Sequence, residues 1–208
     1  MGEAKRRQLA QKICAPLDMN AVNRVAVAMR KLATAASSHQ GSDCYIHAYI
    51  SQHLLKTVGV SAEIVAGYAA WRVGQSDGSV VGHTPQTQGY LPPGAKGFPY
   101  HVWLQVQDQI IDLTTYQLRR KATELDALDG GVTEVDWCPD ILVVNRQDAS
   151  SYKQVAQGDT GLFYYERNIQ VENLLSTSFI SNTEDLAIAE MILSAPDVKV
   201  FGSSNINE

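Results

Sequence analysis

The chain is 208 residues long, 45% hydrophobic and 19% charged, a composition typical of one globular domain and not of a disordered chain. Its net charge of -5 gives an acidic surface that repels phosphate, so the sequence predicts no nucleic-acid partner. No apolar run approaches the roughly 18 residues that a membrane-spanning helix needs, and no continuous apolar segment follows the charged N-terminus, so we expect neither a membrane span nor a signal peptide.

Two helices are predicted in the first part of the chain. The first follows Asp18, a plausible N-cap, and carries apolar residues at three-four spacing until a turn-like stretch at 37–41. The second is capped by Ser42 or Asp43 and ends at Gly59, a residue suited to the left-handed conformation that often closes a helix. Both patterns are typical of helices that pack one face against a core.

A group of strands is predicted next. Residues 60–71 alternate in part and favour a strand. Residues 74–99 are rich in Gly, Pro, Ser and Gln without periodicity, and a loop of that length is usually functional, as a lid, or disordered. Two further strands, over 100–107 and 109–114, are expected to form a hairpin that turns at Asp108.

The remainder of the chain is predicted to mix helices and strands. The expected elements are a helix over 116–128 ended by Gly130-Gly131, strands over 141–144 and 162–165, and a helix between Thr183 and Pro196. Helices first and strands in the middle predict an α+β fold in which N-terminal helices pack on an antiparallel sheet. We expect one domain over 1–208, with a core at 40–115 and a C-terminal α/β extension over 116–208.

The three cysteines are too few and too irregularly spaced for a disulfide framework. Cys14, Cys44 and Cys138 are an odd set without a C-x-x-C pair, so a reducing, cytoplasmic location is the expected one. At least one thiol is free to react. Cys14 and Cys138 have no base nearby in the sequence and are expected to be structural.

One trio of residues carries the candidate chemistry. Cys44 begins a predicted helix, His101 begins a predicted strand, and Asp112 ends the next strand. Backbone N–H groups at a helix start and a neighbouring imidazolium both favour a thiolate over a thiol. His101 can then act as base and acid, while Asp112, costly to bury unpaired in an apolar run, can orient the imidazole across the hairpin.

The stretch from Cys44 to Thr114 resembles the core of the transglutaminase-like (papain-like) superfamily, as a small bacterial-type member. The resemblance rests on five pieces in order, namely Cys44 at a helix start, Leu54-Leu55-Lys56-Thr57-Val58-Gly59-Val60, Val65-Ala66-Gly67-Tyr68, His101-Val102-Trp103-Leu104-Gln105-Val106 and Asp112-Leu113-Thr114. Family members often have Trp after the Cys and Pro after the Asp, where this chain has Tyr45 and Leu113. The resemblance implies a papain/transglutaminase-like core and a Cys-His-Asp triad.

The resemblance also implies a reaction through a thioester. We expect a cysteine hydrolase acting on an amide or peptide bond, with the Cys44 N–H and the side chain of Gln40 as oxyanion donors and Trp103 in the core or above the site. The spacings of His39, Cys44, His47 and His53 fit no common zinc pattern, so neither a metal nor a cofactor is expected. His83, within the long loop, is expected to be solvent-exposed.

Two alternatives remain open from the sequence. An amine in place of water gives acyl transfer, as in transglutaminases or in arylamine N-acetyltransferases, whose usual Arg-Gly-Gly stretch before the Cys is absent here. A catalytically inactive binding module on the same fold would use the 74–99 loop as a partner surface. The triad alone indicates neither the substrate nor the oligomeric state.

Overall fold

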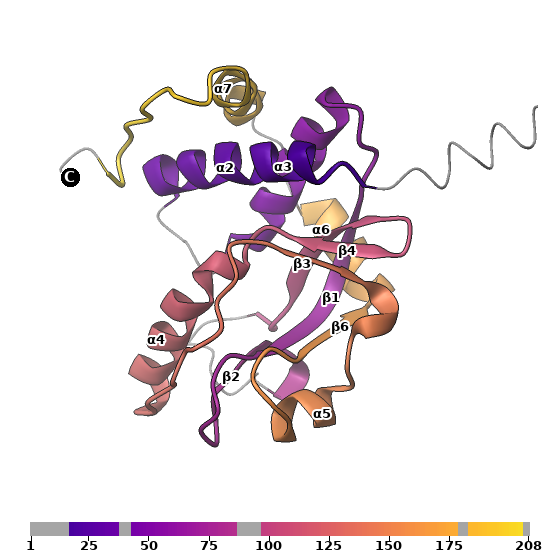
Figure 1. The fold of residues 1–208 in the computed structure, drawn as a ribbon, viewed down its shortest axis with the longest axis vertical. Helices are drawn as coiled ribbons and strands as arrows, with labels where there is room; N and C mark the ends of the chain where they lie inside the picture. Colours follow the sequence, from indigo (N-terminus) through magenta and orange to yellow (C-terminus); the bar gives the residue numbers. More distant parts are fainter. Residues whose placement is uncertain (1–16, 38–42, 87–96, 179–182, 206–208) are drawn as a thin grey trace, which may run out of the picture.

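A six-stranded antiparallel sheet with helices packed against it forms the centre of this computed structural model, which describes residues 17–37, 43–86, 97–178 and 183–205 (Figure 1). The strands are β1 (Glu63–Arg72), β2 (Val80–His83), β3 (His101–Val106), β4 (Gln109–Asp112), β5 (Leu142–Asn145) and β6 (Phe163–Arg167). The helices are α2 (Met19–Ala36), α3 (Cys44–Thr57), α4 (Leu118–Asp129), α5 (Tyr152–Gln157), α6 (Ile169–Ser178) and α7 (Thr183–Ser194). The prediction of an α+β fold with helices on an antiparallel sheet is confirmed.

The long strand β1 organises the sheet. Gly67 pairs with both His101 of β3 and Arg167 of β6, and Ala69 pairs with both His83 of β2 and Tyr165 of β6. Since a strand residue has only two lateral neighbours, β6 follows one side of β1 while β3 and β2 follow each other along the other side. The start of β3 and the end of β2 therefore meet beside β1.

The two N-terminal helices begin and end as their sequences predict. The Asp18 carboxylate accepts hydrogen bonds from the N–H groups of Asn20 and Ala21, which caps α2. Gly59 follows α3 with a φ of 86°, in the left-handed region that a glycine adopts without strain. The apolar faces of α2 and α3 meet one face of the sheet, and Leu54 and Leu55 are fully buried there.

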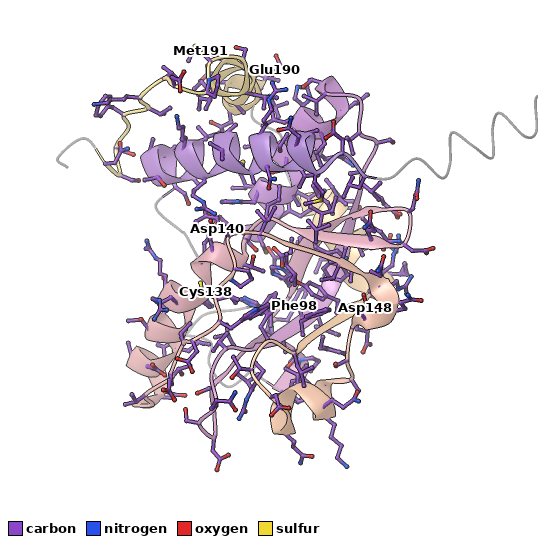
Figure 2. The ribbon with its side chains drawn as sticks, in the orientation of Figure 1. Phe98, Cys138, Asp140, Asp148, Glu190 and Met191 are labelled. Carbon is purple, nitrogen blue, oxygen red and sulfur yellow. The ribbon has the colours of Figure 1, made fainter. Side chains whose placement is uncertain are left out.

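Helices α2, α3 and α7 gather at one end of the molecule, at the top of Figure 1, while α4 and α5 lie at the other end. The contact between α7 and α3 includes an ion pair of 2.6 Å between His53 Nε2 and the carboxylate of Glu190, which is labelled in Figure 2. No helix in the described residues has both the length and the apolar content to cross a membrane.

The structure corrects the sequence prediction in the region before β3. The stretch 74–99 is not one long loop, because residues 80–83 form β2 and pair with β1.

The sequence prediction also lacks two helices of the C-terminal part. These are α5, which begins with a capping box at Ser151 and Gln154, and α6, which follows β6 directly. Strands β5 and β6, which lie in the C-terminal part of the chain, pair with β4 and β1.

Candidate active site

Cys44 is the first residue of α3 and its side chain is buried. The preceding residue, Asp43, makes no side-chain hydrogen bond to the first turn of this helix. Its carboxylate is used elsewhere, accepting from the Ser37 hydroxyl at 2.6 Å and pairing with His47 Nε2 at 3.3 Å. The first N–H groups of α3 are therefore not capped by the Asp43 side chain.

The hairpin of β3 and β4 brings His101 and Asp112 together. Leu104 pairs with Ile111 and Val106 with Gln109, which leaves Gln107 and Asp108 in the turn, where Gln107 has a φ of 54°. Continuing this register sets Asp112 diagonally across from His101 on the same face of the sheet. His101 Nε2 lies 2.7 Å from Asp112 Oδ2, and both residues are buried.

Asp112 is an ionised carboxylate with a complete set of hydrogen-bond donors. Its Oδ1 accepts from the N–H and hydroxyl of Thr114 at 2.8 and 2.7 Å, and its Oδ2 accepts from His101 and from the Tyr165 hydroxyl at 2.7 Å each. Burial raises its pKa, but the charge and hydrogen bond of His101 and the two Thr114 donors lower it more, to about 2. The negative charge is thus stable in the interior of the protein.

His101 is held as an imidazolium between Asp112 and Cys44. Burial lowers its pKa, whereas the charge and hydrogen bond of Asp112, followed by the hydrogen bond and charge of Cys44, raise it to about 10. Nε2 bonds to Asp112, so Nδ1 is the ring nitrogen left for Cys44, which lies close enough to raise the pKa of the imidazole. Nδ1 itself has no hydrogen-bond partner among the described residues.

A small cavity connects these groups. It has a volume of about 20 Å³, close to that of one water molecule, and is lined by Cys44, Trp71, His83, His101, Gln117, Lys121 and their neighbours Thr114, Thr115 and Leu118. Tyr100 also lies close to the thiol: burial, and then the charges of Cys44 and Tyr45, raise its pKa to about 12. Its phenol is therefore uncharged at neutral pH.

His83 lies in the site and is half-buried, so the prediction of a solvent-exposed side chain is wrong. It ends β2 next to the start of β3, and its ring stacks on that of His101 with centroids 5.5 Å apart and an interplanar angle of 16°. Burial, and then the charges of His101 and Lys121, lower its pKa well below the ordinary value for histidine. His83 is therefore neutral beside the charged His101.

The sequence predicts two accessory residues of the site, Gln40 and Trp103. Gln40 lies outside the described residues. Trp103 is buried with Val65 and Ile110, and its ring is nearly parallel to that of His101 at 6.3 Å, but it does not line the cavity. Two residues after His101 on the same sheet face, it also packs edge-on against Tyr165, with centroids 5.2 Å apart.

A second buried pair lies behind the nucleophile. Asp43 and His47 are one helical turn apart on α3, both buried, and Gln117 Nε2 lies 3.4 Å from His47 Nε2. Burial raises the pKa of Asp43, but hydrogen bonds and charge from His47, with donors from Ser37 and Gln117, lower it overall. This cluster links the start of α3 to the turn after β4, where Gln117 reaches the cavity.

The other described thiol is not part of the site. Cys138, labelled in Figure 2, has its Sγ within 3.4 Å of the Thr115 carbonyl oxygen and within 3.5 Å of that of Tyr116. Within the described ranges no three His, Cys, Asp or Glu side chains form a group that could hold a metal ion. Cys14 lies outside the described residues.

Several residues of the site were not found from the sequence. Tyr165 and Trp71 are 53 and 41 positions from Asp112, and they reach the site through the pairing of β1 and β6, whereas Gln117 is five positions from Asp112, in the turn after β4. The frequent Gly and Pro around His83 predict a loop there. The Gly-Tyr pair at Gly67 indicates the strand β1, but nothing in it indicates β6, which pairs with β1.

The comparisons with known proteins identify a family. Residues 18–193 match the family described as protein of unknown function (DUF2026), and the chain belongs to it. A comparison with curated proteins gives no match. Among solved structures, one titled "The crystal structure of genomics APC5867" is similar, with a TM-score of 0.57 and 12% identity over 86% of this chain and 79% of that chain. That likeness concerns the fold alone.

Proposed function

We propose that this protein is a cysteine hydrolase that cleaves an amide or peptide bond through a thioester, on a papain/transglutaminase-like core. Cys44 is the nucleophile, His101 the general base and acid, and Asp112 the residue that orients His101. The observation that carries the proposal is the position of His101, which is bonded to Asp112 through Nε2 at 2.7 Å and lines one small cavity with Cys44.

The first half of the reaction forms the acyl enzyme. The Cys44 thiolate attacks the carbonyl carbon, an S–C bond forms, and the carbonyl π electrons move to oxygen. The Cys44 N–H, at the uncapped start of α3, donates to this oxyanion. The imidazolium of His101 then gives its Nδ1 proton to the departing nitrogen as the C–N bond breaks, leaving a thioester and a neutral imidazole.

The second half of the reaction releases the acid. His101 Nδ1 takes a proton from a water molecule, the hydroxide attacks the thioester carbonyl, and the C–S bond breaks to return the thiolate and the imidazolium. Asp112 stays ionised throughout, because the hydrogen bonds from Thr114 and Tyr165 do not depend on the charge of His101. The imidazole therefore keeps one orientation in both halves of the reaction.

The proposal is tested by the reactivity of Cys44. Iodoacetamide at about pH 6 is expected to alkylate Cys44 faster than the other two cysteines, because a thiol at a helix start beside an imidazolium is in a setting that favours reactivity. Peptide mass mapping distinguishes Cys44 from Cys14 and Cys138. Cys44→Ala removes the fast label, His101→Gln slows it at least about tenfold, and Cys138→Ala leaves it unchanged.

A screen of amide, peptide and ester substrates then separates the possible reactions. A Cys44 thioester detected by intact mass and turned over by water supports hydrolysis, whereas turnover that requires an added amine assigns acyl transfer instead. Absence of fast alkylation at Cys44 in the wild-type protein would overturn the proposal and favour a binding module on the same fold.

A further inference from the structure

We infer that Tyr165 is a positioning residue of the site, which fixes the carboxylate of Asp112 and, through it, the orientation and charge of His101. The inference rests on the proposed function, since it assigns a fourth group to the same site. It goes beyond a triad because Tyr165 belongs to β6, on the far side of β1 from β3 and β4.

The hydrogen-bond pattern defines the role of the phenol. The Tyr165 hydroxyl donates to Asp112 Oδ2 at 2.7 Å, the same oxygen that accepts from His101 Nε2. Trp71 Nε1 donates to the Tyr165 oxygen at 2.9 Å, which occupies an acceptor position and leaves the phenolic proton for Asp112. Burial, and then the charge and hydrogen bond of Asp112, raise the pKa of Tyr165 well above its usual value, so the group remains a donor.

The aromatic packing closes this arrangement into a ring of contacts. Trp71 lies edge-on to His101, with centroids 4.8 Å apart and an interplanar angle of 88°, and edge-on to Tyr165 at 5.8 Å and 83°. Trp71 thus contacts both the imidazole and the phenol that bind the same carboxylate oxygen. Four side chains from β1, β3, β4 and β6 hold one another, and none can rotate without displacing a neighbour.

The other explanation for Tyr165 is purely structural, as a half-buried tyrosine whose hydroxyl needs a partner. The two roles differ in what they change. A structural role alters stability and leaves the titration of the site alone, whereas a positioning role alters the charge balance between Asp112, His101 and Cys44. A hydrogen bond to a charged group contributes enough that its loss is expected to change the reactive fraction about tenfold.

The test uses Tyr165→Phe, which removes one oxygen and retains the ring. In this variant the pH at which Cys44 alkylation is half-maximal is expected to rise by about one unit, and the titration of the His101 ring, followed by 15N NMR, to move up by a similar amount, because a carboxylate that has lost one donor attracts the imidazolium more strongly. Tyr164→Phe is the matched control, because Tyr164 lies next to it on β6, faces the other side of the strand and bonds to Glu166. It is expected to leave both titrations unchanged.

A second variant keeps the inference testable if Tyr165→Phe does not fold. Trp71→Phe retains an aromatic ring and removes the donor to the Tyr165 oxygen, and it is expected to shift both titrations in the same direction by a smaller amount. Wild-type titrations retained in Tyr165→Phe, with Cys44 still reactive, would overturn the inference and leave the proposed function standing. Absence of a reactive Cys44 in the wild type would overturn the proposed function itself.

Discussion

At the scale of single residues, the fold is built to keep one buried carboxylate charged. Asp112 is fully buried and accepts from Thr114 twice, His101 and Tyr165. A buried charge without such donors would cost several kcal/mol. The consequence is that each donor contributes to stability as well as to the geometry of the site.

Thr114→Val isolates one of these donors. The variant retains the backbone N–H and the shape of the side chain but loses the hydroxyl that donates to Asp112 Oδ1. We expect the free energy of unfolding, measured by urea denaturation, to fall by about 1.5–3 kcal/mol, the usual contribution of a hydrogen bond to a charged group. Thr114→Ser keeps the hydroxyl and is expected to lose less than half as much; equal losses in the two variants would show that the hydroxyl bond does not matter.

The ion pair between His101 and Asp112 predicts a pH range in which the protein is most stable. The pKa of His101 is about 10 in the fold against 6.5 for a free imidazole, so its contribution is complete below pH 6.5 and is lost as the pH rises through 10. The pKa of Asp112 is about 2 against 3.8, so its contribution is present above pH 3.8 and is lost as the pH falls through 2. The free energy of unfolding should therefore be greatest between about pH 3.8 and 6.5.

Urea denaturation across this range measures the effect. His101→Gln removes the titrating group and is expected to flatten the decline in stability on the alkaline side, whereas His53→Gln removes a surface histidine and should leave that decline as in the wild type. A decline that persists unchanged in His101→Gln would assign it to other groups.

At the scale of elements, the pairing of β6 with β1 positions the site. A Cβ atom added at Gly67 would lie 1.9 Å from the Glu166 carbonyl oxygen and 2.8 Å from the Asn168 nitrogen, so the strands approach at a distance that only glycine permits. Glu166 and Asn168 flank the end of the strand that carries Tyr165. The close approach of β6 therefore explains why position 67, in the Gly-Tyr signature, is a glycine.

Gly67→Ala is expected to push β6 away from β1. Because the nearest atoms are backbone atoms, the added methyl group must displace the strand, and the free energy of unfolding should fall by at least about 2 kcal/mol. The fast alkylation of Cys44 should decrease as well, since Tyr165 moves with β6. Gly97→Ala is the matched control, because a Cβ there meets no atom within 4 Å among the described residues. If Gly67→Ala is as stable as this control, the close approach is not required.

Local patterns account for what the sequence predicted at this scale. Asp18 and Gly59 mark helix ends by their own chemistry, and the apolar run around Asp112 with a turn at Asp108 predicts the hairpin that joins Asp112 to His101. Site residues such as His83 and Tyr165 could not be predicted, because they reach the site through the pairing of strands that are far apart in the chain. His83 reaches His101 only because β2 and β3 share one side of β1, and no local pattern carries that information.

At the scale of the whole molecule, elements from the C-terminal part of the chain pack against the central sheet and the N-terminal helices. The C-terminal strands β5 and β6 pair with β4 and β1, and α7 packs on α2 and α3. The trio sits between these late strands and the early helices. The sheet, the helices and the site therefore form one interdependent unit, which favours a single unfolding event.

Unfolding by urea is expected to show one transition by different probes. Tryptophan fluorescence reports on Trp71, Trp103 and Trp137, and far-ultraviolet circular dichroism reports on all helices. The two curves should coincide within error, because β1 contributes buried residues to each of the hydrophobic clusters and so links them. Two separated midpoints would show that the helices and the sheet unfold independently.

The distance in sequence between Asp112 and Tyr165 also orders events during synthesis. A nascent chain that has emerged as far as β4 already contains Cys44, His101 and Asp112, but β6 follows more than 50 residues later. Until β6 has been synthesised, Asp112 lacks the hydrogen bond from Tyr165, and β1 lacks a neighbouring strand along one side. On the proposed chemistry, the thiol gains its full reactivity only after β6 has been synthesised and has paired with β1.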